Sequence, residues 1–389
     1  MKNKLAIYGG KPIRGKRKFK SGRIFGKEEE RKVLRILRSD ILSCFRGGPY
    51  VKEFEKKFAS FCGCEFGLAT TSGTTALHTA LAALNLKRGD EVIIPAFTFV
   101  STASVIIQEG GKPVFADIDE TFCINPNDIE KKITPRTKAI IPVHLFGNPA
   151  DMSRIIEIAK RYSLFIIEDC AQAHGASIRE KRVGSFGDFG CFSFFQTKNM
   201  TCGEGGMVVT NNKNLYLRAK LKREHGSPET PGGNWYNYQE LGYNYNMTEI
   251  QAAIGIVQLK RLEKFNLRRI KNANLYRKIL YKQPLTFIKD RPDAVNVYHN
   301  FPMLLPKHLS SKRDIFVKAV RSEGVWIDIC YPKPLYKTPL FINLGLKGKC
   351  PFAEDVASRI VNAFTDPTLS KDYIYDTCRA IIKCLNYFY

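Results

Sequence analysis

Lys198 lies in the stretch FSFFQTKNMTCGEGGMVVT, between an aromatic run and a glycine-rich turn. The hydrophobic sequence on both sides predicts a buried neighbourhood for this cationic side chain. Burial makes a lysine costly to keep charged, because desolvation favours the neutral amine. A sheltered neutral amine is a nucleophile that can bond covalently to a carbonyl carbon. Lys198 is therefore the first candidate catalytic residue.

Two further segments place polar side chains where ligands bind in α/β proteins. ATTSGTTALHTALAAL puts Ser72, Gly73 and Thr74 directly before a helical pattern, and the free amides of a helix start favour a phosphate group. LFIIEDCAQAHGA ends a hydrophobic run on Glu168 and Asp169, and such strand ends face the ligand crevice of open α/β sheets. Taken alone, each segment is also typical of ordinary structure, a capped helix start or a strand-end turn.

Aromatic and amide side chains add three weaker signals. Gln172 follows the acidic pair closely enough to reach the same ligand, and Phe97 and Phe99 follow another strand end in PAFTFVSTASV. Either ring could stack on a flat cofactor, although an isolated phenylalanine is more often part of a core. Asn244 and Asn246 precede a long helical pattern in GYNYNMTEIQ. Their amides could bind phosphate oxygens, but polar loop residues need no such role.

These signals become specific together, because they supply complementary parts of a site for pyridoxal 5'-phosphate. Lys198 would form a Schiff base with its aldehyde, and Asp169 would pair with the pyridinium nitrogen. The helix start would hold the phosphate, and a phenylalanine would cover the ring. The chain order is phosphate helix, stacking residue, aspartate and lysine, as in fold-type I pyridoxal-phosphate enzymes.

The elements that must position these residues follow an α/β pattern. Short β-rich runs alternate with helical patterns, which predicts a mainly parallel sheet. The expected strands are 91–97, 112–118, 138–146 and 164–169, and the expected helices include 74–84, 153–163 and a short one near 102–110. A long helix is expected from Met247, with Thr248 as its N-cap. We expect a large cofactor domain with its N-terminal arm at 1–262 and a smaller α+β domain at 263–389.

Composition excludes several classes of protein. Of 389 residues, 44% are hydrophobic and 25% are charged, which argues against disorder and low complexity. No apolar stretch is long enough to span a bilayer, and the eleven cysteines suit reduced thiols, so we expect a cytoplasmic protein with no membrane partner. We expect no metal site, because CGC at 62–64 lacks a second pair at zinc spacing.

The net charge of +24 has more than one interpretation. A basic surface attracts phosphorylated ligands and nucleic acid alike, and a general lysine bias would produce the same charge with no ligand. No nucleic-acid-binding module is recognisable. We therefore expect small-molecule partners and no nucleic acid.

The sequence resembles the DegT/DnrJ/StrS family of sugar aminotransferases over more than half of the chain. The matching blocks, in order, are SGTTALHTAL, GDEVIIPAFTFVSTA, FADID, IIPVHLFGNPADM, IIEDCAQAHGA, FSFFQTKNMTCGEGGMVVT and GYNYNMTEIQAAIG. The resemblance implies a fold-type I transferase with a seven-stranded type of sheet. It also implies roles for eight residues: Lys198 as Schiff-base lysine and proton shuttle, Asp169 at the pyridine nitrogen, Gln172 near the ring hydroxyl, Phe99 stacked on the ring, Gly73, Thr74 and Ser193 at the phosphate, and Asn244 at the phosphate of a neighbouring subunit.

The implied reaction moves an amino group from glutamate or glutamine to a ketone, in a homodimer with shared active sites. We expect the ketone to be a nucleotide-diphosphate-linked keto-sugar. Gln196 and the opening LAIYGGKPIR resemble the branch of the family that includes cyclitol aminotransferases and 3-amino-5-hydroxybenzoate synthase. A keto-cyclitol is therefore the alternative substrate. Lys198 disfavours the family's dehydratase branch, which is expected to have histidine there, and also disfavours a silent cofactor-binding regulator.

Overall fold

The computed structural model describes residues 4–15, 24–228 and 236–389. Its largest sheet has seven strands in the order β1-β9-β8-β5-β4-β2-β3. The strands are β1 (Phe66–Thr70), β9 (Gly206–Thr210), β8 (Phe189–Ser193), β5 (Phe165–Asp169), β4 (Thr137–Ile140), β2 (Glu91–Pro95) and β3 (Lys112–Ala116). Pairing is parallel from β8 to β3, while β9 is antiparallel to both of its neighbours. This confirms the predicted α/β class with a mainly parallel large sheet.

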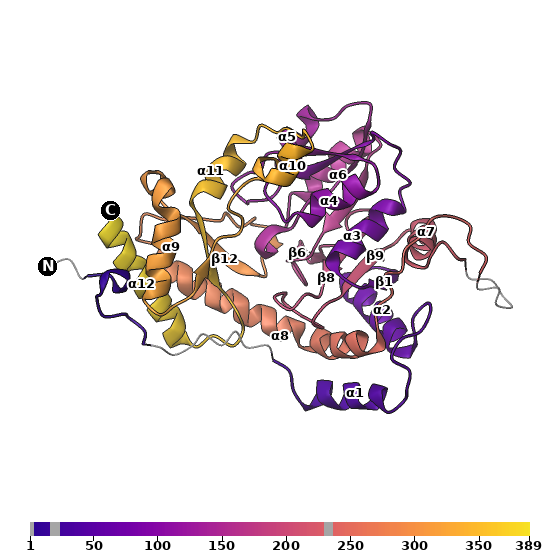
Figure 1. The fold of residues 1–389 in the computed structure, drawn as a ribbon, viewed down its shortest axis with the longest axis horizontal. Coiled ribbons are helices and arrows are strands. Elements are labelled where there is room, and N and C mark those ends of the chain that lie inside the picture. The colour runs from indigo at the N-terminus through magenta and orange to yellow at the C-terminus, as the bar shows by residue number, and fades with distance from the viewer. Residues whose placement is uncertain (1–3, 16–23, 229–235) are drawn as a thin grey trace.

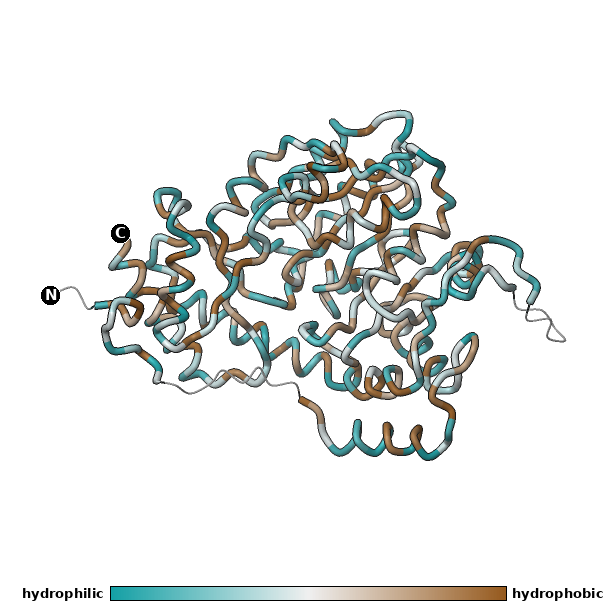
Figure 2. The backbone as a smooth tube through the Cα atoms, in the orientation of Figure 1, coloured by the Kyte–Doolittle hydropathy of each residue, from teal (hydrophilic) through white to brown (hydrophobic). Residues whose placement is uncertain are grey.

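Helices pack on this sheet, as Figure 1 shows. They are α2 (Pro49–Cys62), α3 (Gly73–Ala82), α4 (Ser101–Gln108), α5 (Pro126–Lys131), α6 (Met152–Arg161) and α7 (Lys213–Arg223). Helix α1 (Lys27–Leu37) packs instead on the long helix α8 (Glu249–Leu280). The most hydrophobic parts of the chain are the central strands (Figure 2), which are buried along nearly their whole length. Continuous apolar strands are expected where helices cover both faces of a parallel sheet.

A second, antiparallel sheet has the order β10-β12-β14-β13. Its strands are β10 (Thr286–Phe287), β12 (Asn300–Leu304), β14 (Ile360–Phe364) and β13 (Ile327–Asp328), and the helices that share its core are α9 (Arg313–Ser322) and α12 (Lys371–Phe388). The buried residues of α10 (Pro339–Asn343) and α11 (Pro351–Arg359) belong instead to the core of the large sheet. A small three-stranded sheet joins β11 (Ala294–Val295), β6 (Ser177–Ile178) and β7 (Lys181–Arg182). The mixture of strands and helices expected for residues 263–389 is therefore present.

Helix α8 (Glu249–Leu280) connects the two parts. Thr248 caps it as predicted, because its hydroxyl accepts a hydrogen bond from the Gln251 N–H at 3.3 Å. Ala252 and Ile256 near its start belong to a core cluster of the large-sheet region, whereas later residues of the helix belong to the core of the second sheet. The division expected at residues 262 and 263 falls inside this continuous helix, and it stays a prediction.

The N-terminal segment packs far from the strands that follow it in sequence. Leu5 is buried in the core of the second sheet, and the Ala6 N–H donates to Glu323 Oε1 at 2.8 Å. Arg14 and Asp376 form an ion pair with 2.9 Å between nitrogen and oxygen. Figure 1 accordingly shows the N-terminus and the C-terminus on the same side of the molecule. Across the described residues, no helix combines the length and apolar character needed to cross a membrane.

Candidate active site

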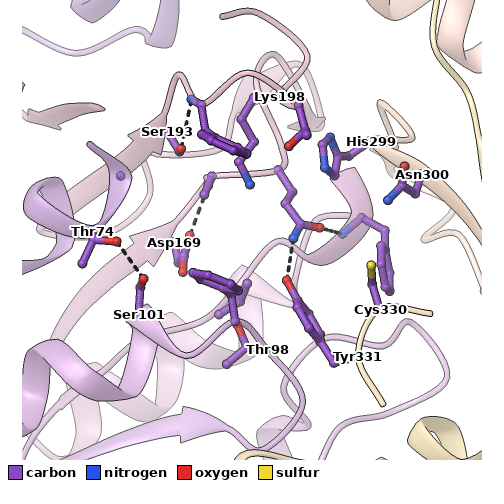
Figure 3. A pocket seen from close by; sticks show the side chains of 18 of the residues that line it. Thr74, Thr98, Ser101, Asp169, Ser193, Lys198, His299, Asn300, Cys330 and Tyr331 are labelled. Carbon is purple, nitrogen blue, oxygen red and sulfur yellow. Dashed lines mark hydrogen bonds between the residues drawn. The ribbon is translucent and has the colours of Figure 1, made fainter. Parts of the chain in front are cut away.

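A cavity of about 600 Å³ lies between the large sheet and the second sheet. Figure 3 shows its side chains converging from both parts of the chain. Seven of the eight predicted site residues line it: Gly73, Thr74, Phe99, Asp169, Gln172, Ser193 and Lys198. Segments separated by more than 120 positions in sequence thus meet in one place, as the parallel sheet topology requires.

The start of α3 forms one end of the cavity. Ser72 caps the helix, because its hydroxyl accepts from the Thr75 N–H at 3.1 Å, and the Thr75 hydroxyl accepts from the Ser72 N–H at 2.8 Å. The cap does not use the backbone N–H groups of Gly73 and Thr74, and these two donors have no hydrogen-bond acceptor among the described residues. Free first-turn amides with the helix dipole behind them suit an anion such as phosphate.

Gly73 also brings α3 close to the end of strand β8. A Cβ atom added at Gly73 would lie 2.5 Å from Ser193 Cβ and 3.0 Å from Ser193 Oγ. Only glycine leaves room for this approach, and it places the Ser193 hydroxyl beside the free amides. Thr74 Oγ1 lies 2.7 Å from Ser101 Oγ. Three hydroxyl side chains therefore surround the helix start.

Asp169 ends β5 and faces the cavity. Its Oδ2 accepts from the Thr102 hydroxyl at 3.0 Å, and its Oδ1 accepts from the Ala171 N–H at 3.1 Å. Burial raises the pKa of Asp169, while these two hydrogen bonds and the positive charge of Lys198 act in the opposite direction. A cationic ring nitrogen next to this carboxyl would favour its ionised form.

Glu168, the other member of the acidic pair, points away from the cavity and is fully buried. It accepts hydrogen bonds from the N–H groups of Gly184, Phe186 and Gly187 at 2.7–2.8 Å. His144 Nε2 lies 3.0 Å from its carboxylate. Because neighbouring residues of a strand face opposite sides, one carboxylate anchors a loop and the other serves the cavity.

Lys198 reaches the cavity from the loop after β8, and Figure 3 places it near Asp169. Burial lowers the pKa of its amine below the ordinary lysine value, and the nearby Asp169 opposes that shift. Asn199 anchors the loop, since its amide donates to Asn266 Oδ1 at 3.0 Å and its Oδ1 lies 3.2 Å from His299 Nδ1. The amine is thus held in a fixed place and is easier to deprotonate than a lysine in water.

Phe99 and Gln172 complete the predicted set in the cavity. The Phe99 ring is 55% exposed, unlike the fully buried Phe97, and its centroid lies 6.3 Å from that of Tyr331. Gln172 accepts from the Phe146 N–H at 2.8 Å and donates to Tyr331 Oη at 3.0 Å. An exposed ring in a cavity can cover a planar ligand, while Gln172 is held by its neighbours.

Asn244 is absent from the described lining of this cavity. Its Oδ1 accepts from the Asn246 amide at 3.2 Å, and its backbone bridges to Glu224. The role expected for it concerns a neighbouring subunit, and it stays a prediction.

Several residues of the site are not predicted from the sequence. Thr102, which holds Asp169 from behind the cavity lining, lies inside an expected helix with no signal that connects it to Asp169. Helix α8 adds Arg269, and the second sheet and its loops add His299, Asn300, Asp328, Cys330, Tyr331, Phe364 and Asp366. No motif marks these positions, because they join the site only through tertiary packing.

The residues present fit pyridoxal 5'-phosphate. The cradle made by Gly73 against Ser193 can take the phosphate, the buried Asp169 carboxyl can take the pyridine nitrogen, and Lys198 supplies the amine. The donor set contains one group for each polar part of the cofactor.

Comparison with known proteins agrees with this chemistry. The chain matches the DegT/DnrJ/EryC1/StrS aminotransferase family over residues 24–382. It is 39% identical to the UDP-N-acetyl-3-dehydro-alpha-D-glucosamine 3-aminotransferase of Acidithiobacillus ferrooxidans, over 87% of this chain and 89% of the relative. It is 37% identical to the GDP-perosamine synthase of Escherichia coli O157:H7, over 86% of this chain and 90% of the relative.

Among solved structures, 3-amino-5-hydroxybenzoic acid synthase superposes with a TM-score of 0.89 at 27% identity, over 97% of this chain and 100% of that one. The match in sequence and in fold covers both parts of the molecule. The chain therefore belongs to the DegT/DnrJ/EryC1/StrS aminotransferase family, and it is a pyridoxal-phosphate-dependent aminotransferase.

Proposed function

We propose that the enzyme transfers an amino group from glutamate or glutamine to a nucleotide-diphosphate-linked keto-sugar, with the cofactor bound covalently to Lys198. The observation that carries the proposal is the meeting of Lys198, Asp169 and the free amides of α3 in one cavity of about 600 Å³. Each of the three is weak evidence alone. Together they match the reactive carbon, the ring nitrogen and the phosphate of the cofactor.

Two observations support a nucleotide sugar as the substrate. The relatives with 39% and 37% identity are named for UDP-linked and GDP-linked sugars. The net charge of +24 favours the approach of a multiply anionic ligand. A keto-cyclitol or an aminohydroxybenzoate precursor is the second candidate, supported by the likeness to 3-amino-5-hydroxybenzoic acid synthase.

Lys198 has two tasks in this proposal. The bound cofactor supplies an electron sink for the carbon that gains or loses the amino group. The lowered pKa of Lys198 increases the fraction of neutral amine, which is the form that attacks a carbonyl carbon. When it is not bonded, the same nitrogen can accept the proton from the amino acid carbon and return it to the ketone carbon. The same side chain would therefore form the covalent bond to the cofactor and, when released, transfer the proton.

The other cavity residues orient the reactants. Asp169 would hold the ring nitrogen in its protonated state, and Thr102 and Ala171 fix the carboxyl through their hydrogen bonds. Gln172 is braced by Tyr331 and would lie near the ring hydroxyl. Phe99 would cover one face of the ring.

We also propose a homodimer in which Asn244 serves the neighbouring site. Around α1, six large hydrophobic side chains are 38–49% exposed: Ile24, Phe25, Leu34, Leu37, Ile41 and Leu42. Figure 2 shows hydrophobic stretches at both ends of this helix, which lies beneath α8 in Figure 1. An apolar surface of this kind supports burial against a second copy of the chain.

The expected domain division and cellular location belong to the same proposal. The second sheet has a core cluster of its own, which supports a large domain at 1–262 with its N-terminal arm and a smaller domain at 263–389. Two observations count against sharp bounds: Phe341 and Val356 belong to the core of the large sheet, and Leu5 belongs to the core of the second sheet. All eleven cysteines are free thiols, which supports a reducing compartment, the cytoplasm.

A substrate panel tests the reaction. The cofactor spectrum reports each half of the reaction separately, first with glutamate or glutamine and then with UDP-, GDP- and dTDP-linked keto-sugars and scyllo-inosose. We expect a higher kcat/KM for a nucleotide sugar than for scyllo-inosose, and a KM that rises with salt as phosphate contacts are screened. Salt-insensitive amination of the free cyclitol alone would replace the first substrate by the second.

Reduction with borohydride followed by peptide mapping tests the lysine. The cofactor should be recovered on Lys198, and Lys198→Ala should yield no adduct. An adduct on another lysine would contradict the assignment.

A further inference from the structure

The second sheet presents one face to the cavity. Asn300 on β12 is paired with Phe364 on β14, and Asp328 on β13 is paired with Asn362 on β14. Directly paired residues of antiparallel strands project on the same face of a sheet. Asn300, Phe364 and Asp328 all line the cavity, so this face forms a wall of the active site.

This wall lies across the cavity from the phosphate end. In Figure 3, Asn300 and Cys330 stand on the side opposite Thr74 and Ser101, and Asp169 lies between the two sides. Gly73, Thr74 and Asp169 would hold the cofactor, and the space between Lys198 and this wall would remain for the substrate.

Polar groups on the wall are left without partners. Asp328 Oδ1 accepts from the Ile329 N–H at 2.8 Å and from Arg321 Nη2 at 3.0 Å, while Oδ2 has no partner among the described residues. The Asn300 side chain forms no hydrogen bond within the described part of the chain. Asn362 is 1% exposed and does not line the cavity; its Oδ1 accepts from the Cys330 N–H at 3.0 Å, so it supports the wall and offers the ligand no group.

Asp328 and Asn300 are only partly buried, so water can bind their unpaired polar groups in the free enzyme, and a ligand that displaces this water must pair with them. A carboxylate oxygen accepts from a hydroxyl or amide N–H, and the asparagine amide both donates and accepts. A ketone with ring hydroxyls satisfies these groups, whereas an apolar ketone leaves them desolvated and unpaired, which is strongly disfavoured.

We propose that Asp328 and Asn300 bind the hydroxyl groups of the ketone ring and thereby determine which ketones the enzyme accepts. This proposal rests on the proposed aminotransfer to a hydroxylated ketone and assigns its recognition to the second sheet. Both are positioning residues for the ketone, and the covalent chemistry stays with Lys198.

The two halves of the reaction separate this role from a general defect. Asp328→Ala, Asp328→Asn and Asn300→Ala enzymes are loaded with cofactor and converted with L-glutamate or L-glutamine. The aminated form is then mixed with the probe that the wild type aminates fastest, chosen from UDP-, GDP- and dTDP-linked keto-sugars and scyllo-inosose. Return of the aldehyde absorbance gives the rate and the apparent Kd.

Losing a hydrogen bond to a charged or buried group weakens binding by about 10- to 100-fold. We expect each alanine variant to raise the apparent Kd of the ketone by that factor, with a smaller rise for Asp328→Asn. The donor half-reaction should stay within about twofold of the wild type. Cyclohexanone, which lacks hydroxyls, should show no difference between wild type and variants.

A control variant addresses a general effect of the substitutions. Asp314→Asn removes a 70% exposed carboxylate that does not line the cavity, and it should leave the ketone Kd unchanged. An equal loss in Asp314→Asn, an equal loss in both half-reactions, or an unchanged ketone Kd in all three site variants would overturn the proposal.

Failure of the proposed function has a different signature. A wild type that converts with the amino donor but aminates no member of the panel would overturn the proposed substrate, and the role of the wall with it. If Asp328→Ala fails to load cofactor, Asp328→Asn and Asn300→Ala carry the same test.

Discussion

Substituting Gly73 by alanine tests the idea that close approach of α3 to β8 builds the phosphate end of the site. The added methyl carbon would lie 2.5 Å from Ser193 Cβ, whereas an ordinary contact begins near 3.4 Å. Ser193 Cβ is fixed to the backbone of a buried strand, so it cannot move away as the tip of a long side chain would. The helix start must shift by the order of 1 Å or the strand end must yield.

Overpacking of this kind costs about 1–3 kcal/mol. Because the displaced atoms belong to the cradle itself, we expect a loss of cofactor affinity of about 5- to 150-fold, the same free energy expressed as a ratio. The assay is equilibrium binding of pyridoxal 5'-phosphate to the cofactor-free enzyme, followed by absorbance, with the thermal unfolding midpoint measured alongside.

A double-mutant cycle identifies the cause. Ser193→Gly removes the carbon that the new methyl group would meet at 2.5 Å and leaves only the backbone Cα at 3.1 Å, so Gly73→Ala should cost less in that background than in the wild type. Gly15→Ala is the matched control, since nothing lies within 4 Å of a Cβ there. Wild-type affinity in Gly73→Ala, or equal losses with and without Ser193, would refute the reasoning.

Three further predictions concern the amine, the acid and the dimer. Asp169→Asn should retain the cofactor but lower kcat by at least about 100-fold, the usual effect of removing a preorganised electrostatic partner; a kcat within threefold of wild type would contradict its role. In cofactor-free enzyme, Lys198→Met should raise the unfolding midpoint near pH 7. The pKa of Lys198 is lowered in the folded state, so between the folded and unfolded pKa values the unfolded chain binds more protons. Wild-type stability therefore rises with pH up to the ordinary lysine pKa of about 10.4, and the advantage of the variant should shrink as the pH rises. A pH-independent difference between the two midpoints would contradict the shift. Mixing inactive Lys198→Ala with an inactive Asn244→Ala chain should restore about a quarter of wild-type activity if two-fold related sites share both residues; a fully active monomer in sedimentation would exclude the sharing.

Sequence patterns located β2, β3, β4 and β5 of the large sheet, because buried parallel strands are continuous hydrophobic runs, but β1 was not predicted. The carboxyl end of one expected strand was not located correctly. The expected strand at 138–146 is a continuous strand only over Thr137–Ile140. Its remainder is buried irregular chain with an isolated bridge between Val143 and Asp169, and it leads into a short 3-10 turn at Leu145–Gly147. Hydrophobic content reports burial, and it does not report where ladder hydrogen bonds stop.

The part of the site built on the large sheet was predictable for a related reason. Its residues follow strand ends and helix starts, whose positions are encoded locally. Asn300 and Asp328 have no local signal, because their arrival at the cavity depends on pairing with β14 and on the packing of the second sheet over the first. The roles of Glu168 and Asp169 were only partly predictable. Strand alternation predicts that the two side chains face opposite sides of the sheet, but it does not indicate which side faces the ligand.

Because α8 is one continuous helix, its twist fixes the orientation of the two walls of the active site relative to each other. Each residue of an α-helix advances it by 1.5 Å and turns it by about 100°. Deleting or inserting one residue between Ile256 and Tyr276 would swing the buried stripe of its second half away from the core that it occupies. The wall that carries Asn300 would then be displaced relative to Lys198, although every residue of the site would still be present. Relatives with altered ketone preference should therefore differ by substitutions on the second sheet, and length changes should be confined to loops outside this helix.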